Sequence, residues 1–274
     1  MSLYFSSLNS GSNGNCYYIG NNTEAVLIDA GLSCKETEKR MRNLNLEMNK
    51  IKAIFISHEH TDHVKGLEII SKKYNIPAFI TKKTLEFSKI PIPENNIVYL
   101  ELNKKIQIGG LTITPFQKLH DAIDPCSFIV SQQDYTVGVF TDIGKPCEDV
   151  IQHFKKCNAV FLEANYDDKM LETGSYPYHL KKRIKSDFGH LSNIQAMELF
   201  LNHRSEHLTH LLLSHLSKEN NDPLLVKELF NRQNTKTEII VASRCNESAL
   251  YEIGNTSIKK AAPKKSIQLT IFEE

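Results

Sequence analysis

The sequence predicts an α/β fold, an αββα sandwich of two mixed β-sheets with outer helices. The first observation behind this prediction is that short apolar, β-branched runs alternate with amphipathic helical patterns along the chain. The second is size: 274 residues allow one large domain or two small ones, and a hydrophobic fraction of 41% can fill a substantial core. We expect both sheets to lie in one domain over residues 1–253.

The first predicted elements are a hairpin and a helix. Residues 17–19 and 25–28 form two strands around a Gly-Asn-Asn turn. A helix over residues 35–43 follows, because Ser33 precedes it and Glu36 lies three residues later, the spacing of a capping box.

Strands and helices continue to alternate through the rest of the chain. Residues 52–57 are a buried strand that ends at a cluster of histidines, and a helix near 64–74 follows. From 97 to 140 strand patterns dominate, and Gly109 with Gly110 marks a hairpin turn. The remaining predicted elements are a strand that starts at Pro77, a helix near 148–156, a strand over 159–163, a helix near 193–203, a strand over 211–214, a helix with Pro223 in its first turn, and a last strand over 238–242.

The composition narrows the class of protein. A net charge of +1, from 33 basic and 32 acidic residues, gives no global sign of a nucleic-acid or membrane partner, so a basic surface would be local. The six cysteines form no C-x-x-C pair, which fits reduced thiols better than disulfides or a structural zinc site. The amino terminus does not resemble a secretory signal, and no run approaches the ~18 apolar residues of a membrane span. We therefore expect a cytoplasmic protein with no membrane partner.

Four ligand-type side chains lie within six residues directly after a predicted strand. His58 and His60 project to the same side of an extended chain, and Asp62 and His63 follow at the start of the next helix. Imidazoles and a carboxylate suit zinc, manganese or iron. The alternative is a solvated polar loop, but four such residues at this spacing after a buried strand favour a metal site.

One cluster cannot complete two metal sites, and three further candidates each follow a predicted strand. They are His120, Asp142 and His215. Taken singly, each would more often be a surface or capping residue. Their repeated placement at strand ends favours the interpretation as ligands, because strand ends are where sites lie in layered α/β folds.

The motif H-x-H-x-D-H at residues 58–63, the preceding segment Leu-Ile-Asp-Ala-Gly at 27–31 and the later His, Asp and His resemble the metallo-β-lactamase superfamily. The resemblance extends from about residue 1 to 253 and implies two divalent metal ions, with zinc or manganese favoured and iron also open. It also implies a role for each residue: His58, His60 and His120 would hold one ion, Asp62, His63 and His215 the other, Asp142 would bridge them, and Asp29 would orient the ligand loop. A cysteine at position 142 would indicate an antibiotic hydrolase; the aspartate instead resembles the phosphodiesterase branches.

Five longer segments resemble one branch of that superfamily, the WalJ (YycJ) proteins. The segments are residues 9–16, 162–167, 176–180, 189–193 and 214–221. Position 9 is Asn where such proteins often have Gly. The resemblance implies a DNA exonuclease with a role in DNA repair.

Phosphodiester cleavage needs a nucleophile, neutralisation of phosphate charge and a proton for the leaving oxygen. Two metal ions would provide the first two, with an activated hydroxide as nucleophile. Asp62 could also accept a hydrogen bond from that hydroxide. His190 is the candidate acid, because its segment resembles the loop histidine of related RNA-processing hydrolases, and by the same analogy Glu163 supports a histidine. The alternative for His190 is a helix-capping or substrate-positioning residue.

Substrate contacts are expected from two segments. Ser12 and Asn15 lie on a Gly-rich loop whose backbone could approach a phosphate, although turns of this composition are common. Arg183 belongs to a basic run over residues 181–185 that could grip a nucleic-acid backbone, although such runs are more often a solvated helix face. The spacing between Asp142 and His215 leaves no room for a large inserted domain, so the site should be open.

The carboxyl end changes character. Residues 254–265 are polar and lysine-rich and are expected to be a flexible linker to a short apolar tail over 266–274. The tail resembles the Q-L-x-L-F peptide by which bacterial replication and repair proteins dock to the DNA sliding clamp; a packed terminal strand is the alternative. The residues expected to dock are Gln268, Leu269, Ile271 and Phe272.

Other functions share the predicted metal centre. An RNA-processing nuclease or a small-molecule phosphodiesterase would use the same ligands. A non-catalytic metal-binding adaptor is disfavoured because every expected ligand is present. The sequence therefore favours a nucleic-acid phosphodiesterase, with DNA as the expected partner.

Overall fold

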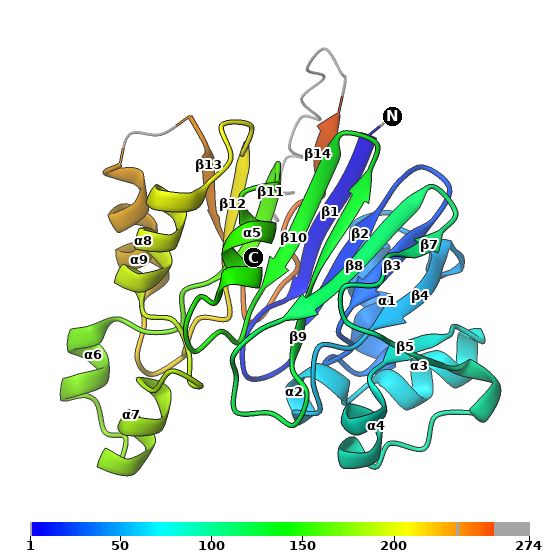
Figure 1. Cartoon of the computed structure of the whole chain (residues 1–274), viewed down its shortest axis with the longest axis horizontal. Coiled ribbons are helices and arrows are strands. Elements are labelled where there is room, and N and C mark those ends of the chain that lie inside the picture. Colours follow the sequence, from blue (N-terminus) through cyan, green and yellow to red (C-terminus); the bar gives the residue numbers. More distant parts are fainter. Residues whose placement is uncertain (1, 234–235, 255–274) are drawn as a thin grey trace, which may run out of the picture.

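The computed structural model describes residues 2–233 and 236–254, and it confirms the predicted αββα sandwich. Two seven-stranded sheets pack face to face, and helices cover the outer face of each (Figure 1). In the figure, α1, α3 and α4 cover the sheet on the right, whereas α8 and α9 cover the sheet on the left.

The first sheet runs in the order β14-β1-β2-β3-β4-β5-β6. From β3 to β6 neighbouring strands are parallel, and from β14 to β3 they are antiparallel. The strands of this sheet are β14 (Tyr251–Gly254), β1 (Ser2–Asn9), β2 (Cys16–Gly20), β3 (Ala25–Ile28), β4 (Ile51–Phe55), β5 (Ala78–Ile80) and β6 (Ile97–Tyr99).

The second sheet runs in the order β13-β12-β11-β10-β9-β8-β7 and repeats this mixture. From β10 to β13 neighbouring strands are parallel, and from β7 to β10 they are antiparallel. Its strands are β13 (Glu238–Val241), β12 (His210–Ser214), β11 (Ala159–Glu163), β10 (Tyr135–Phe140), β9 (Cys126–Gln132), β8 (Leu111–Gln117) and β7 (Ile106–Ile108).

The helices are short and mostly lie outside the sheets. They are α1 (Cys34–Asn43), α2 (Thr61–Val64), α3 (Leu67–Tyr74), α4 (Lys82–Ser88), α5 (Glu148–Phe154), α6 (Asp168–Thr173), α7 (Tyr178–Ile184), α8 (Asn193–His203) and α9 (Pro223–Asn231), with single 3₁₀ turns at Met48–Lys50 and Glu94–Asn96. None of the described helices is long and apolar enough to cross a membrane.

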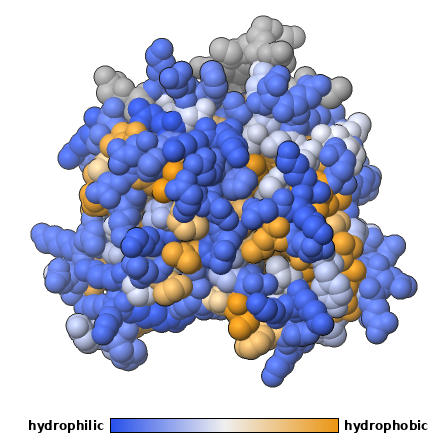
Figure 2. Space-filling view, in the orientation of Figure 1, coloured by the Kyte–Doolittle hydropathy of each residue, from blue (hydrophilic) through white to orange (hydrophobic). Residues whose placement is uncertain are grey.

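The core has three layers because each sheet is apolar on both faces. Between the sheets, the rings of Tyr17 and Phe161 lie 4.8 Å apart and those of Phe55 and Phe79 stack at 4.6 Å. Two further apolar clusters lie between the sheets and their outer helices, one for each sheet. The face of the molecule in Figure 2 is mostly hydrophilic, with separate hydrophobic areas. Burial of strands on both faces explains why their sequences form continuous apolar runs.

Most of the predicted elements are observed, with three differences. The predicted helix near 64–74 is two helices, α2 and α3, because Gly66 donates its N–H to the Ala30 carbonyl at 2.8 Å and the chain bends there. The strand over 238–241 is not the last, because β14 follows and pairs with β1, and the sequence pattern predicts neither of these two strands. The helices α4, α6 and α7 are likewise not predicted.

The predicted division of the chain beyond the sandwich falls mainly on residues that the structure does not describe. Gly254, the first residue of the predicted linker, is the last residue of β14. The rest of the linker and the predicted docking tail, residues 255–274, lie outside the described residues.

Candidate metal centre

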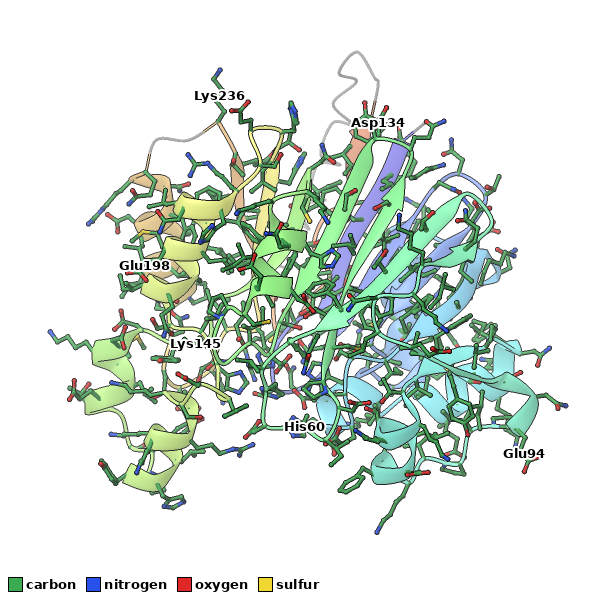
Figure 3. The ribbon with its side chains drawn as sticks, viewed as in Figure 1. His60, Glu94, Asp134, Lys145, Glu198 and Lys236 are labelled. Carbon is green, nitrogen blue, oxygen red and sulfur yellow. The ribbon has the colours of Figure 1, made fainter. Side chains whose placement is uncertain are left out.

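The candidate ligands lie together at one end of the sandwich. His58 to His63 follow β4, His120 follows β8, Asp142 follows β10 and His215 follows β12. Figure 3 shows His60 at the lower end of the sheets, at the end opposite to Asp134 in the β9–β10 turn. Both sheets therefore deliver ligand-type residues to a common edge, as the strand-end pattern predicts.

Three histidines form the first group of ligand atoms. His58 Nε2 lies 3.1 Å from His60 Nδ1, and His120 Nε2 lies 3.4 Å from the same His60 nitrogen. His58 and His120 are buried, whereas His60 is partly exposed. Their nitrogens are close enough to bind one ion.

A second group comes from two segments far apart in the sequence. Asp62 Oδ2 lies 3.6 Å from both His63 Nε2 and His215 Nε2. Asp142 lies between the two groups, with Oδ2 at 3.2 Å from His63 Nε2 and Oδ1 at 3.9 Å from His120 Nε2. All seven residues that the sequence predicts as ligands are thus brought together.

The backbone at three of these strand ends is left-handed. Asp29 has φ 63°, Asp142 has φ 56° and His215 has φ 55°. Non-glycine residues rarely adopt this conformation, and such strain tends to occur at functional sites. The turn at each position places a polar side chain at the edge of a buried strand.

Carboxylates hold two of the imidazoles through the ring nitrogen that points away from the site. Asp29 Oδ2 accepts a hydrogen bond from His63 Nδ1 at 2.7 Å, and Glu163 Oε1 accepts one from His215 Nδ1 at 2.9 Å. Each contact fixes the tautomer with the proton on Nδ1 and leaves Nε2 facing the site. Asp29 and Glu163 therefore both lie where a residue that supports a ligand histidine is expected.

Uncharged groups hold two more of the imidazoles in place. His58 Nδ1 lies 2.8 Å from Ser57 Oγ, whose own proton goes to Asp29, and His120 Nδ1 donates to the Gly189 carbonyl at 3.1 Å. Their Nε2 atoms again face the site. Ser57 was missed in the sequence analysis, although its position beside His58 was a local signal.

Burial keeps part of the site neutral. It lowers the pKa of His58 well below its ordinary value and lowers that of His120 to about 3, because a charged imidazole loses its hydration there. These two imidazoles carry no proton on Nε2 at neutral pH. They are ready metal ligands.

The other half of the site stabilises positive charge. Burial opposes protonation of His63 and His215 too, but the facing carboxylates, Asp142 first, raise the pKa of His63 well above its ordinary value and that of His215 to about 10. Burial also opposes ionisation of the carboxylates, yet the facing imidazoles hold the pKa of Asp142 well below its ordinary value and lower those of Asp62 and Glu163 to about 2. A metal ion would have to displace the imidazole protons, so its affinity should rise with pH.

Two buried atoms test whether metal ions fit this arrangement. Asp142 Oδ2 and His215 Nε2 are buried, and neither meets the geometry of a hydrogen bond with a described residue. Their contacts are ion pairs with other candidate ligands, to His63 Nε2 at 3.2 Å and to Asp62 Oδ2 at 3.6 Å. Buried polar atoms almost always have a hydrogen-bond partner, so ligand atoms that face one another in this way, within a set of imidazoles and carboxylates, fit divalent metal ions.

A cavity of about 190 Å³ adjoins the centre. The residues that line it include His190, His215, Ser12, Tyr176 and Arg183. The side chain of His190 is 20% exposed, and its Nδ1 donates to Glu163 Oε1 at 2.8 Å. A single carboxylate thus contacts both His190 and His215.

The basic run over residues 181–185 is largely paired within the protein. Lys181 Nζ donates to the carbonyls of Glu172 and Gly174 at 2.7 Å each, which caps the end of α6. Arg183 Nε pairs with Asp121, the residue after His120. Of this run, Arg183 is the residue that both lines the cavity and connects to the metal centre.

The two predicted residues of the Gly-rich loop differ in exposure. Ser12 is exposed and lines the cavity. Asn15 is fully buried, and its amide Nδ2 donates to Asp62 Oδ2 at 3.2 Å and lies 3.1 Å from His63 Nε2. The structure therefore places Asn15 against the candidate ligands rather than at the surface where substrate contact was expected.

Lys118 and Asn165 are polar neighbours that the sequence analysis missed. Lys118 is 1% exposed, and its Nζ donates to the Thr141 carbonyl at 2.8 Å, directly before Asp142. Asn165 Nδ2 donates to the His215 carbonyl at 2.8 Å. Both residues hold turns that carry candidate ligands. The one signal for them in the sequence was the position of a polar residue beside a strand end.

Comparison with known proteins agrees with this geometry. The model of the β-lactamase superfamily domain matches residues 24–215. Exodeoxyribonuclease YycJ of Bacillus anthracis is 34% identical over 224 residues, covering 81% of this chain and 85% of that protein. Exodeoxyribonuclease WalJ of Streptococcus pneumoniae is 32% identical over 270 residues, covering 96% of this chain and 97% of that protein.

A solved structure shows the same fold. The metallo-β-lactamase fold protein YhfI of Bacillus subtilis superimposes with a TM-score of 0.71 at 14% identity, covering 92% of this chain and 100% of that one. The matched family model and the two relatives above 30% identity confirm the resemblance stated from the sequence. The chain therefore belongs to the metallo-β-lactamase superfamily of hydrolases, in the branch of the WalJ and YycJ proteins.

Proposed function

We propose that the protein is a dinuclear metal-dependent phosphodiesterase that acts on nucleic acid, specifically a DNA exonuclease. The observation that carries the proposal is the convergence of seven ligand-type side chains with an aspartate, Asp142, between the two groups. The relatives named as exodeoxyribonucleases, which match over most of their length, support DNA as the substrate.

The ligands divide into two sets. The first set would be His58, His60 and His120, the second Asp62, His63 and His215, with Asp142 shared. Nitrogen and carboxylate donors suit zinc or manganese, and iron is also compatible. Bound ions would supply Lewis acidity toward the phosphate and would activate water for attack.

The protein's own residues would do the remaining work. The carboxylate of Asp62, 22% exposed, can accept a hydrogen bond from the attacking water and orient it. His190 lines the cavity, and Glu163 holds its Nδ1, so Nε2 is free to give a proton to the leaving oxygen. Ser12 and Arg183 line the same cavity and would contact the phosphate backbone.

An open site suits a polymer. Between Asp142 and His215 the chain forms the strands β11 and β12 and the helices α5 to α8, with no further domain. The helices α6 and α7 lie beside the ligand end of the sandwich rather than across it (Figure 1). The end of a DNA strand could therefore reach the metal centre without movement of a lid.

The test is cleavage of end-labelled single- and double-stranded DNA and RNA by protein with measured zinc or manganese content. We expect stepwise shortening of DNA from one end. Intact DNA and RNA in the presence of verified metal would refute the nuclease assignment. Cleavage of precursor RNA alone would favour an RNA-processing nuclease. Turnover of small phosphodiesters alone would favour a small-molecule phosphodiesterase.

We also propose that the tail docks to the bacterial sliding clamp. The sequence supports it: Leu269, Ile271 and Phe272 could anchor in an apolar cleft while Gln268 hydrogen-bonds at its rim. Binding of purified clamp to the full chain and to a chain without residues 268–274 tests the proposal. Equal affinity of both, or no binding at tens of micromolar, would refute docking.

A further inference from the structure

A buried chain of hydrogen bonds connects the two segments that supply the second ligand set. The backbone N–H of His215 donates to Ser10 Oγ at 2.7 Å, and Ser10 Oγ lies 2.8 Å from the hydroxyl of Tyr17. The Tyr17 hydroxyl donates to Asn15 Oδ1 at 3.2 Å, and Asn15 Nδ2 donates to Asp62 Oδ2 at 3.2 Å. One continuous path therefore runs from the His215 turn to the Asp62 turn.

The direction of each bond in this path is determined. Since Tyr17 donates to Asn15 and Ser10 accepts from His215, the remaining hydroxyl proton of Ser10 must go to Tyr17. The amide of Asn15 is also oriented, because its Oδ1 accepts a second hydrogen bond from the Gly11 N–H at 2.9 Å. Its Nδ2 must then face Asp62. Every hydroxyl in the path donates once and accepts once.

Burial makes this path sensitive to the loss of any one of its hydrogen bonds. Ser10, Asn15 and Tyr17 each have 0% exposed surface. Water cannot replace a lost partner there, so removing one member leaves a buried polar atom without a hydrogen bond. The neighbouring groups must then shift or remain unpaired, and both of the ligand-bearing turns are among those neighbours.

The first ligand set is held differently. His58 is held by Ser57 and His120 by the Gly189 carbonyl. Neither contact involves Ser10, Tyr17 or Asn15. A disturbance of the buried path should therefore reach the second set before the first.

We propose that Tyr17 is a positioning residue for the second metal site, because its hydroxyl links Ser10 to Asn15 and so fixes the spacing between the His215 and Asp62 turns. The inference rests on the proposed dinuclear centre. It assigns to Asn15 the role of orienting Asp62 instead of binding substrate. Supporting residues of this kind typically change metal affinity 10–100-fold.

A purely structural role for Tyr17 is the competing explanation, because its ring packs on Phe161 in the core. The substitution Tyr17→Phe retains the ring and removes only the hydroxyl. Tyr18→Phe is a matched control: Tyr18 is the next residue of β2, is 1% exposed and belongs to the apolar cluster on the other face of the sheet. Its hydroxyl forms no hydrogen bond with any residue that the structure describes.

The experiment measures stepwise Mn²⁺ binding to full-length protein by competition with a chromophoric chelator, together with the spin-coupled electron paramagnetic resonance signal of two neighbouring Mn²⁺ ions. For Tyr17→Phe we expect the first affinity to stay within about twofold and the second to fall about 10–100-fold, with loss of the coupled signal at two equivalents. Tyr18→Phe should match wild type in both affinities.

The outcomes separate this inference from the proposed function. If Tyr17→Phe lost affinity for both Mn²⁺ ions equally, or for neither, the inference would be overturned. Binding of two ions by the wild-type protein would still support the dinuclear centre. A single ion in wild type would overturn the dinuclear centre and the inference with it. Ser10→Ala tests the same path. A variant with both Ser10→Ala and Tyr17→Phe should bind the second Mn²⁺ no more weakly than either single variant, because each substitution already breaks the path. Additive losses would contradict a continuous path.

Discussion

At the scale of single residues, the site depends on which nitrogen of each imidazole faces inward. Asp29 and Glu163 accept the Nδ1 protons of His63 and His215, and both leave Nε2 toward the common centre. Glu163 also accepts from His190 at 2.8 Å, so one carboxylate supports a candidate ligand and the candidate acid. The sequence identifies the histidines, but their tautomers follow from partners in other segments.

Asp62 and His190 give the first prediction at this scale. Asp62→Ala should abolish turnover, and His190→Ala should reduce kcat by roughly 10²–10⁴-fold, the usual contribution of a general acid or base. Steady-state kinetics at verified metal content measures both. His179→Ala is the control, because His179 is exposed on α7 and does not line the cavity. A His190→Ala enzyme as fast as wild type would remove the acid role and leave the nuclease assignment standing.

A second prediction concerns the pH dependence of stability in protein freed of metal by a chelator. The pKa of His215 is raised from 6.5 to about 10, so its contribution is complete below pH 6.5 and is lost as pH rises through about 10. The pKa of Glu163 is lowered from 4.5 to about 2, so its contribution is complete above pH 4.5 and is lost as pH falls through about 2.

The pKa of His120 is lowered by burial from 6.5 to about 3, so below pH 6.5 the unfolded chain takes up a proton that the folded protein does not, and stability falls. Because the contribution of His215 is lost as pH rises above 6.5, the melting temperature of the metal-free protein should be highest near pH 6.5. Thermal melts followed by circular dichroism measure it. Glu163→Gln should flatten the acid side of the profile, because the amide does not titrate. A wild-type melting temperature that rises steadily from pH 6.5 to 10 would contradict the coupling of His215 to its carboxylates.

At the scale of elements, short helices and strand ends bring ligands close to neighbouring backbone. The turn between α2 and α3 has Gly66 against the loop after β3, where an added Cβ would lie 1.9 Å from the Leu32 carbonyl oxygen. The loop carries Asp29 and α2 carries Asp62 and His63. Close contact of these two backbones therefore sets the distance between a supporting carboxylate and its histidine.

The prediction at this scale is that Gly66→Ala destabilises the protein. Gly66 is the N-cap of α3, a position where alanine is disfavoured relative to glycine. Overpacking of a tight contact typically costs about 1–3 kcal/mol in addition. Gly110→Ala is the control, since its nearest neighbour would be the flexible end of Glu24 at 3.2 Å. Chemical unfolding measures both variants. Equal stability of Gly66→Ala and wild type would contradict the close packing of the α2–α3 turn.

At the scale of the whole molecule, the site exists only because two sheets end at the same edge. The first sheet supplies His58 to His63 after β4, and the second supplies His120, Asp142 and His215 after β8, β10 and β12. Ions held between them would connect the two halves of the sandwich. Metal binding should therefore stabilise the whole fold and not one loop alone.

We accordingly predict that chelation lowers the melting temperature. Ligands that bind only the folded state stabilise it by about 2.7 kcal/mol at a free concentration of 100 times Kd. Calorimetric scans of metal-loaded and chelated protein measure the shift. Asp142→Ala should reduce the difference, because it removes the carboxylate between the two ligand groups. A wild-type melting temperature that does not respond to chelation would argue against ions at the centre.

The sequence by itself determined the features that local patterns encode. The strand over 159–163 and the helix over 193–203 occur with the predicted bounds, since apolar periodicity and capping are properties of adjacent residues. The cluster over 58–63 was evident because its members are close in sequence. Strand-end placement then singled out His120, Asp142 and His215.

Only the tertiary structure decided how these residues work together. It buried Asn15 against Asp62, paired Arg183 with Asp121 and joined β14 to β1. None of these contacts lies within one helix or hairpin. Burial and hydrogen-bond partners are properties of surfaces that meet when distant segments pack, so the sequence showed which side chains could bind metal and the packing decided which atoms face it.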